Sequence, residues 1–537
     1  MKKLLGKLKS AVYVIAILMT VAYIVYRIGF TLPINLGITG MIFALIVLGL
    51  EIWESLDFFI YYLNILSVDQ KSPAIPIVND STLYPDVDVF IATINENEAL
   101  LRNTIEACKN MEYPDKSKVH IYICDDGNRE GIARLADSMG IGYITRLNNK
   151  NAKAGNYNHA LKKTSSPLIA TFDADMCPTP NFLMTTVPFF IVKDKVGFVQ
   201  LPQSFNNPDI YQLRFGMSDK LPFEQEYFYH RIQIAKNATN STVYCGTNAV
   251  ISREALDATD GFALSTISED IATGMLIEEQ GYKGIALDNV EAYGESVNDL
   301  TAFAKQRSRW ARGCVQIFKK YKISNRKGLN FRQKLEYLSC ISYWFFGIKR
   351  MIYLIAPLLF SLFGLIIVDC DLKMFLAFWV PTYLVKRFAL DALEGRRRSS
   401  TWTKIYETVL TPVMCKEVFK ELIGLGSTKF EVTPKTKWSK KMTKTNKFLL
   451  SVHLTFLALS IAAVVMSGMK AFNEGIIVYV LPLIWLISNI FYLTISVLFD
   501  LRVKPVYYEK FVPNKIKKYN KFSIISLLGT IGKKKFK

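Results

Sequence analysis

The stretch Leu168–Asp175, LIATFDAD, is an apolar run that ends in two aspartates separated by one residue. A continuous apolar run of this length is typical of a strand buried on both faces of a sheet. Side chains two residues apart in an extended chain point to the same side, so the carboxylates of Asp173 and Asp175 can clamp a hard divalent cation on a diphosphate. A lone pair of this kind arises often by chance, and its meaning depends on the rest of the chain.

Further short apolar runs alternate with helical patterns between about residues 67 and 325. The runs that indicate strands are Val87–Thr93, His120–Asp126, Gly142–Arg146 and Gly197–Pro202. Their composition suits a sheet covered by helices on both faces, which predicts an α/β domain. Ligands of such sheets bind beyond the carboxyl ends of the strands, so we expect an active site where two strands end in paired acids.

The chain on either side of this domain is apolar. Of the 537 residues 50% are hydrophobic, with 35 Phe and 27 Tyr, which is typical of a membrane protein. The run Ala11–Phe30 and a second run that begins near Leu36 predict a membrane hairpin in residues 1–66. A signal peptide is the alternative, but no small-residue cleavage site follows the first run. The later spans are predicted at Arg350–Val368, Met374–Leu390, Phe448–Met466 and Gly475–Leu498.

The placement of basic residues predicts how these six spans are oriented. Lysines precede the first span, and Arg396–Arg398 lie between the second and third of the later spans. By the positive-inside rule, both termini and the α/β domain are then cytoplasmic in a multi-pass cell membrane protein. The net charge of +20 includes a basic stretch from Arg502 to Lys537, which favours an anionic lipid surface over nucleic acid as the partner. The eight scattered cysteines argue against a zinc site or a disulfide framework.

Residues 326–537 also contain two segments that are too polar to span a membrane. Arg332–Phe345 and Thr401–Leu422 mix charged and apolar residues, which predicts amphipathic helices on the inner membrane surface. Core helices of the α/β domain are an open alternative for both. The predicted domains are therefore residues 1–66, 67–325 and 326–537.

Three more motifs carry residues suited to catalysis. Cys124–Gly127 (CDDG) ends a predicted strand, where Asp125 and Asp126 can accept hydrogen bonds from a base or a ribose, although such a sequence is also a common turn. Ser268–Asp270 (SED) opens a helical pattern; its acids suit ordinary capping or removal of a proton from an acceptor hydroxyl. Gln306–Trp310 (QRSRW) can neutralise a departing diphosphate and stack on a sugar, or anchor a helix at the membrane.

Taken together, the order and spacing of these motifs resemble those of the processive family 2 glycosyltransferases, in the cellulose synthase-like group. That group carries D, D-x-D, T/S-E-D and Q-x-x-R-W in a GT-A domain between membrane helices. The resemblance begins near Pro85 and runs to the end of the chain. Other segments that support it are Asp88–Glu96 (DVFIATINE), Ala152–Asn156 (AKAGN), Tyr244–Asn248 (YCGTN) and Phe430–Lys435 (FEVTPK). The last of these resembles the gating loop of cellulose synthases, here residues 428–437.

The resemblance implies a role for each matched residue. Asp270 is expected to be the general base, with Glu269 beside it, while Asp173 and Asp175 hold Mg²⁺ or Mn²⁺ against the diphosphate. The residues expected to bind the nucleotide are Thr93, Glu96, Asp125, Asp126, Lys153, Arg309 and Thr433. Those expected to border the acceptor are Cys245, Gly246, Gln306 and Trp310. Those of the gating loop are Phe430, Val432, Thr433 and Lys435.

The resemblance implies a GT-A, Rossmann-like cytosolic domain inserted in a membrane domain of six helices. The implied activity is inverting polymerisation of a UDP-sugar, with UDP-glucose favoured, into a cellulose-like or capsular β-glucan that leaves through the protein's own channel. A glycolipid-forming enzyme, a synthase for another UDP-hexose, and a transporter with a degenerate domain are the alternatives. The lipid bilayer and the growing polysaccharide are the expected partners.

Two positions depart from the cellulose synthase pattern. Ser268 stands where Thr is usual, which keeps the hydroxyl, and Met176 follows the D-x-D where His is common. If that His binds metal in the family, a third ligand must come from elsewhere here. The tail after Leu501 has no room for a cyclic-di-GMP-binding PilZ domain, so regulation of that type is not expected.

Overall fold

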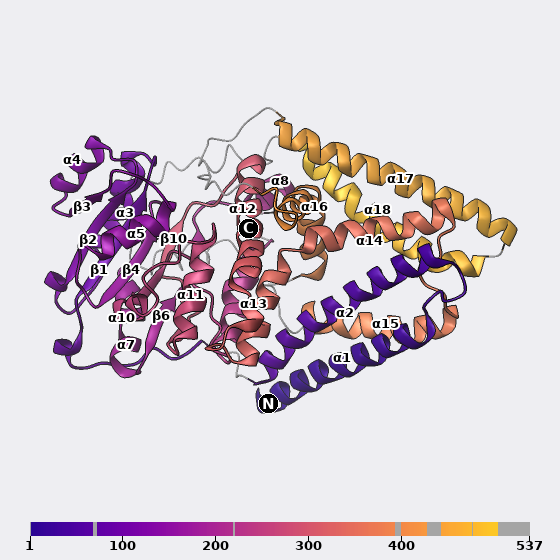
Figure 1. Ribbon diagram of the computed structural model, residues 1–537, viewed down its shortest axis with the longest axis horizontal. Helices are drawn as coiled ribbons and strands as arrows, with labels where there is room; N and C mark the ends of the chain where they lie inside the picture. Colours follow the sequence, from indigo (N-terminus) through magenta and orange to yellow (C-terminus); the bar gives the residue numbers. More distant parts are fainter. Residues whose placement is uncertain are drawn as a thin grey trace, which may run out of the picture.

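The computed structural model describes residues 2–67, 72–217, 221–391, 399–426, 442–474 and 476–502. It has an α/β domain at one end and long helices at the other, as Figure 1 shows. The predicted gating loop and the basic tail lie outside the described residues.

The α/β domain is built on a seven-stranded sheet in the order β3-β2-β1-β4-β8-β6-β9. Its strands are β1 Val87–Thr93, β2 Val119–Asp125, β3 Gly142–Thr145, β4 Leu168–Asp173, β6 Val196–Gln200, β8 Ala249–Ser252 and β9 Lys283–Ala286. All neighbours are parallel except β8, which runs antiparallel to both β4 and β6. A smaller sheet joins β5 Cys177–Pro178, β10 Ala292–Gly294 and β7 Ser204–Phe205. The mixed sheet is that of the GT-A fold.

The five predicted strands are all present, and both faces of the sheet are covered. On one face Leu101 and Ile105 of α3 (Glu98–Lys109) are fully buried, and on the other Tyr157 of α5 (Ala152–Leu161) and Ile277 of α11 (Glu269–Glu279) are. The parallel register pairs Thr93 with Asp125, and Ala92 with Asp173. The carboxyl ends of β1, β2 and β4 therefore meet at one edge, where the motif acids follow.

Six long helices form the other end of the molecule (Figure 1). They are α1 Lys2–Phe30, α2 Ile38–Ser67, α14 Phe346–Phe363, α15 Leu372–Asp391, α17 Lys444–Glu474 and α18 Val480–Leu501. Four segments of the described chain are long and apolar enough to cross a membrane: Lys9–Phe30, Phe346–Phe363, Lys444–Asn473 and Ile477–Leu501. The other two predicted spans correspond to α2 and α15, which lie beside α1. Neither is among these four segments, so the count of six stays a prediction.

Helices α12 (Leu300–Tyr321), α13 (Phe331–Tyr343) and α16 (Ser400–Leu422) lie between the two ends (Figure 1). The predicted segments Arg332–Phe345 and Thr401–Leu422 are helical, as expected. Val409 and Met414 of α16 are fully buried in a core shared with α12, α14 and α18. This shared apolar core fixes the α/β domain against the long helices, since its burial removes apolar surface of both from water.

Candidate active site

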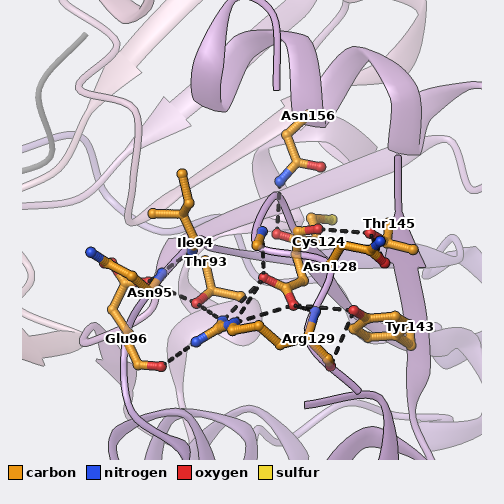
Figure 2. Close-up of polar contacts among 12 residues, drawn as sticks. Thr93, Ile94, Asn95, Glu96, Cys124, Asn128, Arg129, Tyr143, Thr145 and Asn156 are labelled. Carbon is orange, nitrogen blue, oxygen red and sulfur yellow. Dashed lines mark hydrogen bonds and ion pairs between the residues drawn. The ribbon is translucent and has the colours of Figure 1, made fainter. Parts of the chain in front are cut away.

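The loop after β1 is shaped by the carboxylate of Glu96. Its Oε2 atom accepts hydrogen bonds from Thr93 Oγ1 at 2.7 Å, from the Ile94 amide at 2.9 Å and from the Asn95 amide at 3.2 Å. Figure 2 shows these residues together at the end of the strand. Thr93 and Glu96, both predicted to bind nucleotide, therefore lie in one rigid loop.

Asp125, at the end of β2, is fully buried. Its carboxylate accepts hydrogen bonds from the Gly127 amide at 2.9 Å, the Arg129 amide at 2.9 Å and the Tyr143 hydroxyl at 3.1 Å. A Cβ at Gly127 would lie 2.1 Å from the Ile94 carbonyl oxygen, so only glycine fits this turn. The oxygens of Asp125 are thus used within the protein to fold the loop.

Arg129 joins the loops after β1 and β2, a role that no sequence motif indicated. Its guanidinium donates to the Glu96 carbonyl at 2.5 Å, to Thr93 Oγ1 at 2.7 Å and to Asp125 Oδ1 at 3.1 Å, as Figure 2 shows. A planar group with five donors suits such a junction because it satisfies several acceptors in one fixed geometry.

Asp126 has a different partner from Asp125: it forms a bidentate ion pair with Arg146, at 2.6 and 2.8 Å. Arg146 also donates to the carbonyl oxygens of Lys150 and Ala152, both at 2.8 Å, where α5 begins. The backbone of Ala152 is left-handed there, with φ 44°. This arrangement fixes the start of α5 and so positions Lys153.

Lys153 connects two predicted parts of the site. Its Nζ donates to Asp173 Oδ1 at 2.5 Å and to the Gly246 carbonyl at 2.6 Å. The Asp173 side chain is 42% exposed, so water screens this ion pair in part. The Lys153 ammonium group and Asp173, the first acid of the D-x-D motif, are therefore in direct contact.

Met176 takes no part in a cluster of ligands. It is 3% exposed, and its sulfur lies 3.9 Å from Asn248 Nδ2 and against Gly294, where a Cβ would approach it to 2.5 Å. Within the described ranges no group of three or more His, Cys, Asp or Glu residues is suited to hold a metal. Met176 therefore lies in the core, and the assignment of Asp173 and Asp175 as metal ligands stays a prediction.

Glu269 and Asp270 form the first turn of α11. Burial raises the pKa of the Glu269 carboxyl to about 7, and the charge of Asp270 adds to the effect. Burial also raises the pKa of Asp270, while the Ile271 amide at 2.9 Å, Lys153 and Arg309 oppose it. Paired acids with raised pKa values in a cleft are suited to proton transfer near neutral pH.

The start of α11 is pressed against α12. A Cβ at Gly313 would lie 2.0 Å from the Ser268 hydroxyl oxygen, so this contact requires glycine. Ser268 stands at the N-cap, as expected, but its side chain makes no capping hydrogen bond. Instead, the side chain of Gln316 on α12 accepts a hydrogen bond from the Ile267 amide at 3.1 Å. Helix α12 therefore sets the position of the two acids.

Arg307, an unassigned position inside the QRSRW motif, organises its neighbours. The guanidinium donates to Glu224 at 2.7 Å and to Gln306 Oε1 at 2.9 Å. It also lies 4.3 Å from the ring centroids of Phe303 and Trp310. Arg307 is only 5% exposed, so this buried guanidinium supports the side chains of Gln306 and Trp310.

One cavity of about 2110 Å³ brings most of the site residues together and continues between the long helices. The predicted site residues on its wall are Thr93, Glu96, Asp126, Lys153, Asp173, Asp175, Cys245, Glu269, Asp270, Gln306, Arg309 and Trp310. Of the described site residues, Asp125 and Gly246 are not on this wall. Phe430, Val432, Thr433 and Lys435 fall outside the described residues.

Comparison with known proteins finds two family models and a set of relatives. Residues 85–313 match the glycosyltransferase-like family 2 model, and residues 257–403 match the cellulose synthase model. A UDP-forming cellulose synthase catalytic subunit of Pseudomonas fluorescens is 32% identical over 436 residues, 81% of this chain and 59% of that protein. Residues 85–403 of the chain are therefore similar to the cellulose synthase-like family 2 glycosyltransferases.

Other relatives of this cellulose synthase-like chain agree. The UDP-forming cellulose synthase catalytic subunit of Xanthomonas axonopodis pv. citri is 32% identical over 413 residues, 77% of this chain and 56% of that protein. The chain thus spans a little more than half the length of these two relatives. A mannosyltransferase of Pyrobaculum calidifontis, solved with GDP-mannose and Mn²⁺, aligns over 71% of this chain and 99% of its own, at 19% identity and a TM-score of 0.47.

Proposed function

We propose that this chain is a processive, inverting glycosyltransferase that polymerises UDP-glucose into a β-linked polysaccharide and exports it through its own membrane helices. The observation that carries the proposal is the single cavity that joins the motif acids to the space between the helices. A single-transfer enzyme needs no such path. Six spans with both termini and the α/β domain in the cytoplasm complete the proposed arrangement.

Asp270 is proposed as the general base. Its Oδ1 accepts the Ile271 amide at 2.9 Å, which leaves Oδ2 on the side of Gly246 and Lys153. An acceptor hydroxyl that enters between Trp310 and Cys245 can give its proton to this oxygen and attack the sugar from the face opposite the leaving UDP. Displacement from the opposite face inverts an α-linked donor to a β-linked product.

The leaving diphosphate is proposed to meet Lys153 and Arg309, which both line the cavity beside the acids. Cations placed where charge develops stabilise the transition state more than the ground state. Two carboxylates of one extended segment, Asp173 and Asp175, fit a divalent cation because such ions prefer oxygen ligands. When bound there, Mg²⁺ or Mn²⁺ would supply further neutralisation of the diphosphate.

Membrane vesicles that expose the α/β domain outward test this function. Each UDP-sugar is supplied singly with Mg²⁺ or Mn²⁺, UDP release is followed, and the product is sized and analysed for linkage. We expect release from UDP-glucose and a polymer with β linkages, either cellulose-like or of the capsular kind. A product extended by one sugar on a lipid would favour a glycolipid synthase, and release from a different UDP-hexose would reassign the donor.

Replacing Gly246 by alanine is predicted to slow transfer. Gly246 has φ +78°, and an added Cβ would lie 3.2 Å from Asp270 Oδ2 and 3.5 Å from Lys153 Nζ. We expect kcat to fall roughly tenfold to a hundredfold, because small misplacements of reacting groups are costly. Gly281→Ala is the matched control, since Gly281 has φ +84° with nothing within 4 Å of the new Cβ. Equal rates in the two variants would contradict this placement of Asp270.

A further inference from the structure

Arg129 lies behind the wall of the cavity rather than on it. The loop after β1 lines the cavity with Thr93, Ile94 and Glu96. Neither Arg129 nor Asp125 is on that wall, although the guanidinium of Arg129 bonds to two residues of the lining loop. Figure 2 shows the guanidinium between Thr93 and Glu96. Arg129 therefore supports the lining residues without facing the cavity itself.

The carboxylate of Glu96 uses its two oxygens differently. Oε2 accepts three hydrogen bonds from its own loop, those of Thr93 Oγ1 and of the Ile94 and Asn95 amides. Oε1 accepts no hydrogen bond from the residues that the structure describes, and Glu96 lines the cavity. The hydrogen-bond donors of a uridine nucleotide are the N–H of its base and the hydroxyls of its ribose, and a carboxylate oxygen can accept from either. The position of Glu96 therefore decides how well this wall fits a nucleotide.

A continuous chain of hydrogen bonds runs from Asp125 through Arg129 to Glu96. Arg129 Nη2 donates to Asp125 Oδ1 at 3.1 Å and to Thr93 Oγ1 at 2.7 Å. The Thr93 hydroxyl in turn donates to Glu96 Oε2 at 2.7 Å. Arg129 Nη1 donates to the carbonyl oxygen of Glu96 at 2.5 Å. Both the side chain and the backbone of Glu96 are thus tied to one guanidinium.

The remaining contact between the loops after β1 and β2 does not fix Glu96. Among the described residues, the other hydrogen bond between these loops runs from the Asp126 amide to the Thr93 carbonyl oxygen at 2.9 Å. This bond continues the pairing of β1 with β2 and stops three residues before Glu96. Without the Arg129 side chain, Glu96 would keep the bonds within its own loop and lose its link to the neighbouring strand.

The guanidinium of Arg129 is itself anchored on a buried acid. The side chain of Asp125 is 0% exposed and that of Arg129 is 26% exposed. Asp125 Oδ2 also accepts hydrogen bonds from the Arg129 amide at 2.9 Å and from the Tyr143 hydroxyl at 3.1 Å, so the carboxylate cannot turn away. A guanidinium is planar and presents five donors in a fixed geometry. Once it is held on Asp125, its remaining donors are therefore aimed at Thr93 and Glu96.

We propose that Arg129 is a positioning residue for the nucleotide: anchored on Asp125, it holds the loop of Thr93 and Glu96 in the shape that binds the UDP part of the substrate. A loop that is ordered in advance does not have to be ordered when the nucleotide binds, so affinity is higher. The proposal rests on the proposed function, in which Thr93 and Glu96 bind UDP. Because Arg129 lies outside the cavity and far along the chain from Asp270, it acts on binding rather than on transfer.

Arg129→Ala tests this role through the separate effects on KM and kcat in membrane vesicles. We expect the KM for UDP-glucose and the Kd for UDP to rise roughly tenfold or more, because the loop then has to be ordered at each binding event. The value of kcat should stay within about threefold, since Asp270 and Lys153 are untouched. Arg129→Lys should recover only part of the affinity, because one ammonium group cannot bridge three acceptors. Arg134→Ala is the matched control: Arg134 lies on α4 (Glu130–Ser138), 71% exposed and paired with Glu130 at 3.2 Å, and its loss should change neither constant.

Chemical rescue separates positioning from a general loss of structure. The Arg129 side chain is partly exposed, so the space that alanine opens can be reached from water. Millimolar guanidinium should lower the KM of Arg129→Ala roughly threefold or more, whereas methylammonium at the same concentration should not, because only the planar ion can bridge the three acceptors. An unchanged KM in Arg129→Ala, a fall in kcat with KM preserved, or equal rescue by both ions would overturn the proposal. Wild-type protein that neither binds UDP nor releases it from UDP-glucose would instead contradict the proposed function.

Discussion

Asp270→Asn is expected to abolish polymer synthesis, with UDP release falling by about a thousandfold, a typical value for loss of a general base. Asparagine keeps the size of the side chain and can still accept the Ile271 amide hydrogen bond of 2.9 Å. It cannot take up the proton of the acceptor hydroxyl. Binding of UDP, measured by calorimetry, should persist because Thr93, Glu96 and Lys153 are untouched. Undiminished synthesis by the variant would remove Asp270 from the role of base.

The same pair of acids fixes the pH dependence of that reaction. A base acts only when ionised, and burial raises the pKa of Glu269 to about 7 and also raises that of Asp270. As pH falls through about 7 the pair takes up a proton, so kcat should fall on the acid side. Glu269→Gln removes a neighbouring negative charge, which lowers the pKa of Asp270 and moves the fall in kcat to lower pH. If kcat falls at the same pH in Glu269→Gln as in the wild type, the two acids are not coupled.

The sheet could be predicted largely from the sequence because its strands are short apolar runs that end in acids. The predicted Val87–Thr93 coincides with β1, and Leu168–Asp175 contains β4. Strand β8, Ala249–Ser252, was not predicted: four residues carry little pattern, and its antiparallel place between β4 and β6 depends on the path of the whole chain. The long helices could be predicted from the length of their apolar runs. Whether each of them crosses a membrane depends on the bilayer as well as on the helix.

The site was predictable as a set of motifs but not as a set of contacts. Successive residues of a strand alternate in direction, so one of Asp125 and Asp126 had to turn inward. The sequence could not say that Asp125 would be buried and Asp126 would face the cavity. Arg129 and Arg307 were missed because their partners, Glu96 and Glu224, are 33 and 83 residues away. Pairings of this range leave no local signal.

Lys153→Met is expected to act in opposite directions on metal binding and on catalysis. In the structure the Lys153 ammonium sits 2.5 Å from Asp173 Oδ1, so it competes with a divalent cation for that carboxylate. Without the lysine, we expect Mn²⁺ to bind the nucleotide-free protein roughly tenfold more tightly, since a charge-assisted bond no longer has to be broken. The rate of UDP release should nevertheless fall roughly a hundredfold, because the leaving diphosphate loses a cation placed to stabilise it. Mn²⁺ binding can be followed by electron paramagnetic resonance, and turnover in vesicles.

Two comparisons separate this competition from a general loss of structure. Asp173→Asn should weaken both Mn²⁺ binding and turnover. Adding Lys153→Met to it should leave Mn²⁺ binding nearly unchanged, because the lysine then has no carboxylate for which to compete. Lys109→Met, a surface lysine that donates to the Met139 carbonyl at 2.8 Å, should change neither quantity. If Lys153→Met weakened Mn²⁺ binding, the lysine would be supporting the metal site rather than competing with it. The contact between Lys153 and Asp173 would then belong to the working state, and the donor would have to bind with that ion pair intact.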